Sequence, residues 1–152
     1  MKIILEAKEA PDLLPIDAAR ASDLGERLAH VMREGVPYCA INLVNAIGGE
    51  LEARTALHYL IGQERVRYYP WGLYALMELP RPQSVTLRHL LDATIGPLVT
   101  CTTGGMAEWV RTVTGEEPSA GALRKCLSRL VKDGVFQRID SGKYQKIRSA
   151  VL

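Results

Sequence analysis

Basic side chains crowd the last part of this chain, where they could bind phosphate groups. Residues 119–152 contain eight Lys or Arg and two Asp or Glu, which gives the segment a net charge of +6. Residues 1–83 (nine basic, eleven acidic) and residues 84–118 (two basic, four acidic) each carry a net charge of −2. The whole chain has a net charge of only +2. A local excess of this size favours a polyanionic partner over a general role in solubility.

Two elements must position these charges, a helix and a hairpin. Apolar residues recur at helical spacing after Ser119, a plausible N-cap, and the pattern ends at Gly134. The stripe consists of Leu123, Leu127, Leu130 and Val131. Residues 135–139 and 143–147 are then short runs rich in β-branched and aromatic residues, and Asp-Ser-Gly joins them. That composition predicts a two-stranded hairpin.

The same order of elements is predicted twice along the chain. In the second half, helices over 85–93 and 105–114 and a short strand over 98–102 precede the basic helix. In the first half, the patterns predict helices over 23–34, 37–47 and 50–61 and a hairpin over 65–69 and 73–76. Apolar positions of the third helices coincide at an offset of 70 residues, and those of the preceding helices at 69, as for Ile41 and Val110. This spacing indicates a structural repeat with one residue added in the second turn.

The repeat sets the predicted domain boundaries. Residues 1–21 form a lead-in, with a short strand over 2–6 and a helical stretch over 10–21. Residues 22–79 form the first unit and residues 84–152 the second. Residues 80–83 are the linker, because two prolines in the surrounding ELPRPQ resist both helix and central strand.

Three helices followed by a hairpin resemble the winged helix-turn-helix superfamily. GMAEWVRTVTGEEPSAGALRKCLSRLVKDGVFQRIDSGKYQKI carries the stronger resemblance, and AINLVNAIGGELEARTALHYLIGQERVRYYPWGLYAL carries a less specific one. The resemblance implies a mainly α fold with small β-hairpins (α+β), made of two tandem winged helix-turn-helix domains. The resemblance concerns the fold more than the function. Together with the basic third helix and wing, it favours a sequence-specific double-stranded DNA-binding protein, most plausibly a small transcriptional regulator, that reads DNA mainly with these elements of the second unit.

The predicted DNA contacts of the second unit follow from the geometry of the basic helix. With about 100° per residue, the side opposite Leu123 carries polar and basic side chains, which is the arrangement that a helix in the major groove requires. The wing adds further charge, and the N-cap with its free backbone N–H groups could bind a phosphate. The predicted contacts are Ser119, Arg124, Lys125, Ser128, Arg129, Lys132, Arg138, Lys143, Tyr144 and Lys146.

The first unit is expected to have an unequal role. Two carboxylates, Glu50 and Glu52, occupy the start of its third helix, where they repel phosphate, and its hairpin is aromatic. The hairpin could stack on bases, pack on another protein or pack on its own core. We therefore expect a weaker DNA contact or a protein-interaction surface. The residues that would contact DNA there are Arg54, Thr55, His58, Arg65 and Arg67.

Two further partners stay open at this point. A homodimer or another protein could use the first unit. Tandem winged-helix proteins also include protein-interaction scaffolds in chromosome-maintenance and other multi-subunit complexes, and this is the alternative function. An aromatic, weakly charged first hairpin suits the scaffold, whereas the basic second unit suits DNA.

Other classes of protein fit the sequence poorly. It has no Walker loop, GxSxG, HExxH or GxGxxG motif, so we expect no enzyme and no cofactor. The three cysteines and three histidines are scattered rather than paired, so we expect no metal and reduced thiols. No apolar run reaches the length of a membrane span, and the first residues do not resemble a secretory signal. We expect a cytoplasmic protein, associated with the nucleoid if the source is a prokaryote.

Overall fold

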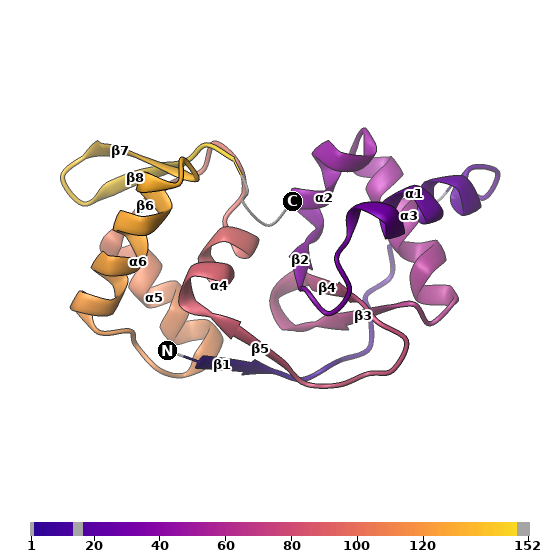
Figure 1. The fold of residues 1–152 in the computed structure, drawn as a ribbon, viewed down its shortest axis with the longest axis horizontal. Helices are drawn as coiled ribbons and strands as arrows, with labels where there is room; N and C mark the ends of the chain where they lie inside the picture. The colour runs from indigo at the N-terminus through magenta and orange to yellow at the C-terminus, as the bar shows by residue number, and fades with distance from the viewer. Residues whose placement is uncertain (1, 14–16, 149–152) are drawn as a thin grey trace. The chain divides into compact units, whose positions relative to one another are not determined.

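A computed structural model describes residues 2–13 and 17–148, and in them it shows a mixed α+β fold (Figure 1). The chain divides into two compact units, one of residues 4–83 and one that starts at residue 84 and includes residues 2–3. The elements before residue 80 are β1 (Lys2–Leu5), α1 (Ala21–Val31), β2 (Tyr38–Cys39), α2 (Ala40–Ile47), α3 (Glu50–Gly62), β3 (Val66–Tyr69) and β4 (Leu73–Leu76). Those after it are β5 (Gln83–Thr86), α4 (Leu87–Thr94), β6 (Thr100–Thr102), α5 (Thr103–Thr114), α6 (Ala120–Lys132), β7 (Phe136–Asp140) and β8 (Lys143–Lys146).

The two units repeat one topology. Each has the order helix, strand, helix, helix, strand, strand, and in each the last strand lies in the middle of a three-stranded sheet. The sheet orders are β2-β4-β3 and β6-β8-β7, with antiparallel neighbours. Helices α3 and α6 both have 13 residues and start 70 positions apart, as the sequence predicts. A separate two-stranded sheet pairs β1 with β5.

Local chemistry explains where the helices of the second unit begin. The side chains of Thr86, Thr102 and Ser119 accept hydrogen bonds from the backbone N–H three residues later, so α4, α5 and α6 each have an N-cap. Helices α2 and α5 both end at a glycine with positive φ, Gly48 at 110° and Gly115 at 79°, a conformation that glycine adopts at little cost.

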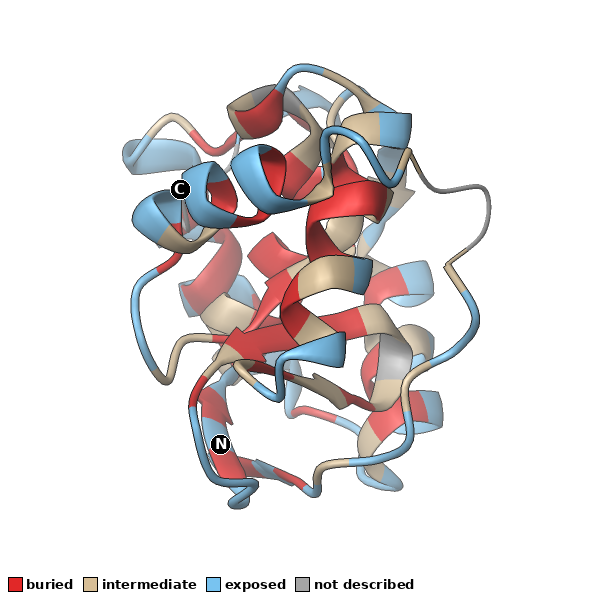
Figure 2. Ribbon diagram, turned by 90° about the vertical axis from the view of Figure 1, so that its right-hand side faces the viewer, coloured by how far each residue is buried: buried red, intermediate tan, exposed pale blue. Residues whose placement is uncertain are grey.

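Each unit buries its own core. The helices are buried on one side and exposed on the other, as the alternation of red and blue around them in Figure 2 shows. The first core is built around Leu28, Leu43, Leu57 and Leu60, together with the fully buried aromatic rings of Tyr38 and Tyr69. The second is built around Leu90, Leu91, Val110, Leu127, Leu130 and Phe136. Burial of these side chains supplies the main driving force for folding.

Three details of the first unit and its repeat differ from the prediction. The helix predicted to begin at Pro37 begins at Ala40, because residues 38–39 pair with β4 as strand β2. Ile41 does not match buried Val110, since its side chain is 48% exposed. The capping glycines Gly48 and Gly115 lie 67 positions apart while α3 and α6 lie 70 apart, so the second turn is longer by three residues rather than one.

The segment around the predicted linker also contains structure. Gln83 begins strand β5, and the helix predicted from Val85 begins at Leu87, after the cap Thr86. Strand β1 confirms the short strand predicted near the N-terminus. Of the predicted helical stretch over 10–21, residues 14–16 lie outside the described part, and residues 10–13 contain no helix.

Candidate nucleic-acid interface

The outer face of α6 carries the predicted polar and basic residues. Leu123, Cys126, Leu127 and Leu130 are buried against the rest of the second unit. The side chains on the opposite side are exposed, as predicted; they are Arg124, Lys125, Ser128, Arg129 and Lys132. The apolar side fixes the rotation of the helix about its axis, so the cationic side must face solvent.

The hairpin β7–β8 brings more cationic side chains beside α6. Gly142, with a φ of 69°, forms the turn between the strands, and Lys143 follows it with an exposed side chain. Arg138 and Tyr144 are directly opposite each other across the two strands, so their side chains lie on one face of the hairpin. Arg138 is exposed and Tyr144 is half-buried.

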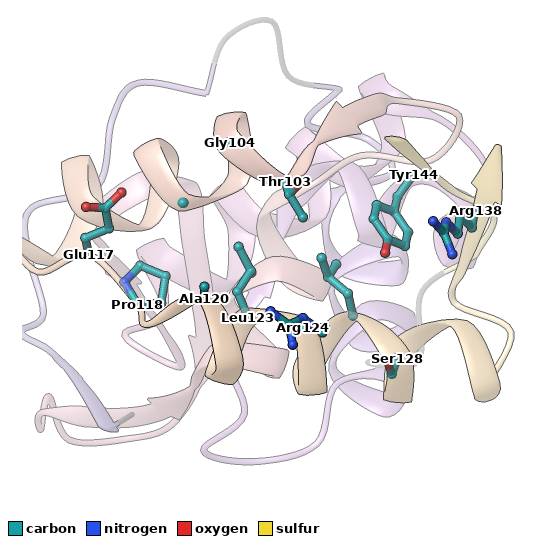
Figure 3. Close-up of a pocket in the computed structure, with 12 residues that line it drawn as sticks. Thr103, Gly104, Glu117, Pro118, Ala120, Leu123, Arg124, Ser128, Arg138 and Tyr144 are labelled. Atoms are coloured by element: carbon teal, nitrogen blue, oxygen red, sulfur yellow. The ribbon is translucent and has the colours of Figure 1, made fainter. Parts of the chain in front are cut away.

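A groove of about 800 Å³ lies between α5, α6 and this hairpin. Its cationic side chains are Arg124 from α6 and Arg138 from β7, and Tyr144 and Ser128 add hydroxyl groups. In Figure 3 the Tyr144 ring hangs from β8 with its hydroxyl toward α6, and Arg138 lies beside it. Glu117 lies at the end opposite Arg138, with Arg124 between them, so a bound anion is favoured in the part between the two arginines, away from Glu117.

The basic residues of α6 divide between the two sides of the helix. Arg124 and Ser128 line the groove. Around the helix axis, Lys125 lies about 100° and Lys132 about 80° from Arg124. Arg129 lies on the far side, near buried Cys126 and Arg88. Burial raises the pKa of the Cys126 thiol to about 11, and the positive charges of Arg88 and Arg129 oppose that rise. The five predicted residues of this face are thus all exposed, but a ligand in the groove would contact only Arg124 and Ser128.

Six cations of α6 and the hairpin have no ion pair with any other residue of the described chain. They are Arg124, Lys125, Arg129, Lys132, Arg138 and Lys143. We call these residues the open cations. Two acidic residues lie in this region. The carboxylate of Asp133 accepts from Arg88, and its backbone carbonyl accepts from Arg148 at 2.8 Å. Asp140 is opposite Lys143 across the two strands, but its carboxylate accepts from the backbone N–H of Ser141 and forms no ion pair with the lysine.

Lys146 corrects the prediction, because its side chain is fully buried. Its exposed fraction is 0%, and its Nζ lies 3.0 Å from Oδ1 of Asp92 in α4. The ammonium group also donates to the backbone carbonyl oxygen of Asp92. A side chain enclosed in this way cannot reach a phosphate, so Lys146 is a core residue and not a DNA contact.

Thr55 also contradicts its predicted role. It occupies the position on α3 that Lys125 occupies on α6, yet it is only 1% exposed. Its hydroxyl donates to the backbone oxygen of Leu51 at 2.8 Å and accepts from the backbone N–H of Asp17 at 3.3 Å. Nearby, Arg20 pairs with Glu52 at 3.6 Å. The chain before α1 thus covers the middle of the face that would have to enter a DNA groove.

The remaining cations predicted for the first unit are engaged within that unit. Arg54 pairs with Glu50 at 2.9 Å, and Arg65 donates to both carboxylate oxygens of Glu26. The Arg65 guanidinium holds the pKa of the Glu26 carboxyl below its usual value. Arg67 donates to the backbone oxygen of Glu78. His58 is exposed. The three arginines predicted to act with it are engaged by acceptors of their own unit, unlike the open cations of α6.

The aromatic hairpin of the first unit mostly serves its own core. Tyr69 is fully buried and Tyr74 nearly so, and burial raises the pKa of the Tyr74 hydroxyl to about 12. Tyr68 is half-buried with its ring 5.2 Å from that of Tyr74. The backbone of Lys8 pairs with Tyr68 along the outer edge of β3. Of the three packing possibilities, the core accounts for Tyr69 and Tyr74.

The side of the groove formed by the start of α5 was not predicted from the sequence. Thr103 and Gly104, at the start of α5, line it opposite α6. Their segment, TTGG, reads as an ordinary turn before a helix, and only the fold brings it to the groove. The Ser119 hydroxyl, predicted as a phosphate contact, accepts from the backbone N–H of Ala122 at 3.1 Å, so capping is its role in this structure.

Comparisons with protein-family models, with curated proteins and with solved structures found no match. No helix within residues 2–13 and 17–148 has the length and apolar character needed to cross a membrane. Among the same residues, no group of three or more His, Cys, Asp or Glu side chains is arranged to hold a metal ion.

Proposed function

We propose that this protein binds double-stranded DNA through α6 and the β7–β8 hairpin of its second unit. In this proposal both units are winged helix-turn-helix domains, and the order helix, strand, helix, helix, strand, strand in each supports that assignment. Helix α6 enters the major groove and the hairpin contacts the adjacent backbone. Recognition of particular sequences would make the protein a small transcriptional regulator.

The open cations are the observation that carries the proposal. They lie on α6 and the hairpin, two of them line the groove between these elements, and none forms an ion pair within the described chain. Arginine and lysine supply most contacts to phosphate, and arginine can also read guanine edges in the major groove. Such a surface attracts a duplex through its charge and orients it through its shape.

Salt dependence of binding, measured on a pool of genomic fragments whose retained members are sequenced, tests the proposal. If all six open cations neutralise phosphates, the slope of log K against log salt is about −5. The variant Arg124→Ala/Arg138→Ala removes the two groove arginines and should make that slope shallower by about 1.8. Enrichment of one sequence among the retained fragments is expected for a regulator.

The matched control removes two exposed arginines that already have carboxylate partners. Arg54 lies 70 positions before Arg124, at the equivalent place on α3, and Arg111 pairs with Glu108 on α5. Arg54→Ala/Arg111→Ala lowers the net charge equally. Its slope should nevertheless stay close to that of the wild type, because these arginines already pair with carboxylates. Equal losses for the two double variants would mean that charge acts only in general and would reject the assigned surface.

The scaffold alternative applies chiefly to the first unit. Its predicted DNA-reading face is covered at Thr55, and Arg54, Arg65 and Arg67 are engaged within the unit. These contacts favour a protein-binding or structural role for that unit over a second DNA reader. Absence of any salt-dependent duplex binding by the whole protein would move the scaffold to first place.

A further inference from the structure

The buried pair Lys146–Asp92 is the one buried ion pair in the described chain, and the binding surface does not use it. Lys146 is the last residue of β8, and Asp92 lies in the last turns of α4. Their side chains are 0% and 3% exposed. The ammonium group also reaches the backbone oxygen of Asp92, one of the carbonyls that the end of a helix leaves without an intrahelical partner. One side chain thus joins α4 to the hairpin.

Stability alone does not explain an ion pair in this place. Removing two charges from water costs much of what their attraction returns, and a well-packed apolar pair of similar volume is often as stable or more so. A buried ion pair is better suited to selecting one arrangement, because any alternative leaves a charge buried without its partner.

Besides the glycine turn and the ladder with β6, the hairpin has few buried side chains that would select its arrangement. In β7 and β8, only Phe136 and Lys146 are buried, and they are directly opposite each other. The other side chains are exposed or half-buried and mostly polar. Because neighbouring side chains point to opposite faces, a shift of β8 by one residue would bring Gln145 or Ile147 to Asp92 in place of the cation. Ile147 cannot bond to a carboxylate, and Gln145 could donate a hydrogen bond but carries no charge to balance the buried carboxylate.

Backbone contacts of the same residue reinforce this position. The N–H of Lys146 donates to the oxygen of Val99 at 3.1 Å, and its carbonyl oxygen accepts from Leu98 at 2.9 Å. Tyr144 and its opposite residue Arg138 lie two residues further along the hairpin, at the groove. The location of Lys146 therefore determines where these two groove side chains lie.

We propose that the Lys146–Asp92 pair sets the register of the β7–β8 hairpin and so positions Arg138 and Tyr144 beside α6. Lys146 and Asp92 are positioning residues, since neither side chain is accessible to a ligand. The effect on the hairpin is a property of the free protein, whereas the consequence for DNA rests on the proposed function.

The test uses the full chain with Lys146→Met, and with Asp92→Leu/Lys146→Met as the variant that avoids a buried lone carboxylate. The single change should lower the melting temperature, and the double variant should recover part of that loss. The double variant should still lose the backbone nuclear Overhauser contact between Arg138 and Tyr144. Its hairpin amides should exchange hydrogen about tenfold faster or more, and its duplex affinity should fall roughly ten- to a hundredfold.

Lys143→Met is the control, because it removes the same charge from an exposed position on the same strand. It should weaken duplex binding through the loss of one charge while keeping the Arg138–Tyr144 contact and the slow exchange. A double variant that keeps both the contact and the slow exchange would overturn the register proposal. Loss of the contact with unchanged duplex affinity would uphold the register proposal and reject the hairpin as part of the DNA surface.

Discussion

The open cations of α6 and the hairpin differ from the cations of the first unit in what surrounds them. Arg54 and Arg65 each face a carboxylate, while Arg124 and Arg138 face a groove. An exposed ion pair stabilises a protein by little, often less than about 1 kcal/mol, but it cancels much of the field that would attract a phosphate. An ion pair with a carboxylate therefore distinguishes the cations of the first unit from those of α6 and the hairpin better than the number of basic residues does.

Cys126 gives a prediction for the dependence of stability on pH. Burial raises the pKa of its thiol to about 11 in the folded protein, above the ordinary value of 9.0. The folded state then keeps a proton that the unfolded state loses, so this contribution to stability is full below pH 9 and declines as the pH rises toward 11. Urea unfolding of the wild type from pH 7 to 10.5 should show that decline.

The same titration on two variants isolates the thiol. Cys126→Ala should show a smaller loss of unfolding free energy above pH 9 than the wild type does. Val110→Ala, a buried change in α5 that removes no titrating group, should lower stability by a similar amount at every pH. Parallel curves for the wild type and Cys126→Ala would contradict the assignment.

At the scale of elements, equivalent helices of equal length differ in whether their outer face is covered. Both have 13 residues at an offset of 70, but the chain around Asp17 covers α3 and nothing in the described second unit covers the outer face of α6. The covering segment explains why the same position is a buried threonine in one helix and an exposed lysine in the other.

Exchanging these two residue types tests that explanation. Thr55→Lys would force a long cationic side chain into a position that is 1% exposed, and it should lower the free energy of unfolding by about 2 kcal/mol or more. Lys125→Thr, at the equivalent exposed position, should change it by no more than about 0.5 kcal/mol. Denaturant unfolding of both variants measures the difference. Equal small effects would mean that the segment around Asp17 does not cover α3.

The elements with strong local signals could be predicted from the sequence. Helix α6 has an apolar stripe, a capping serine and a terminal glycine, so its bounds and its exposed polar residues were correct. Val131, which was placed in the apolar stripe, is exposed instead. Pro37 misled because a proline suits the first turn of a helix, and only pairing with β4 makes the next residues a strand. Lys146 misled because no local pattern shows that a lysine faces inward toward a carboxylate 54 residues away.

At the scale of the whole molecule, the second unit is not continuous in sequence. Strand β1 pairs with β5, and residues 2–3 belong to the compact unit that starts at residue 84. Side chains of β1 alternate between buried and exposed, so Ile3 is 4% exposed and Ile4 is 55% exposed. The buried positions contribute apolar surface to the pairing.

Ile3→Asp should therefore lower the local stability of the second unit, although residues 4–83 separate residue 3 from the rest of that unit. Hydrogen exchange in peptides that cover residues 83–94 should become faster, because β5 loses a buried neighbour in the strand that pairs with it. Peptides that cover residues 50–69 should exchange as in the wild type. Ile4→Asp, the same change one residue along at an exposed position, should leave both regions unaltered. Similar effects of the two changes would show that the pairing of β1 with β5 is unimportant for stability.

The discontinuity of the second unit has a consequence for biosynthesis. A ribosome makes β1 before the first unit and β5 after it, so the partner of β1 emerges only when the whole first unit has been made. During that interval β1 is a strand without its partner, and the apolar side chains of Ile3 and Leu5, buried in the folded protein, are open to other chains.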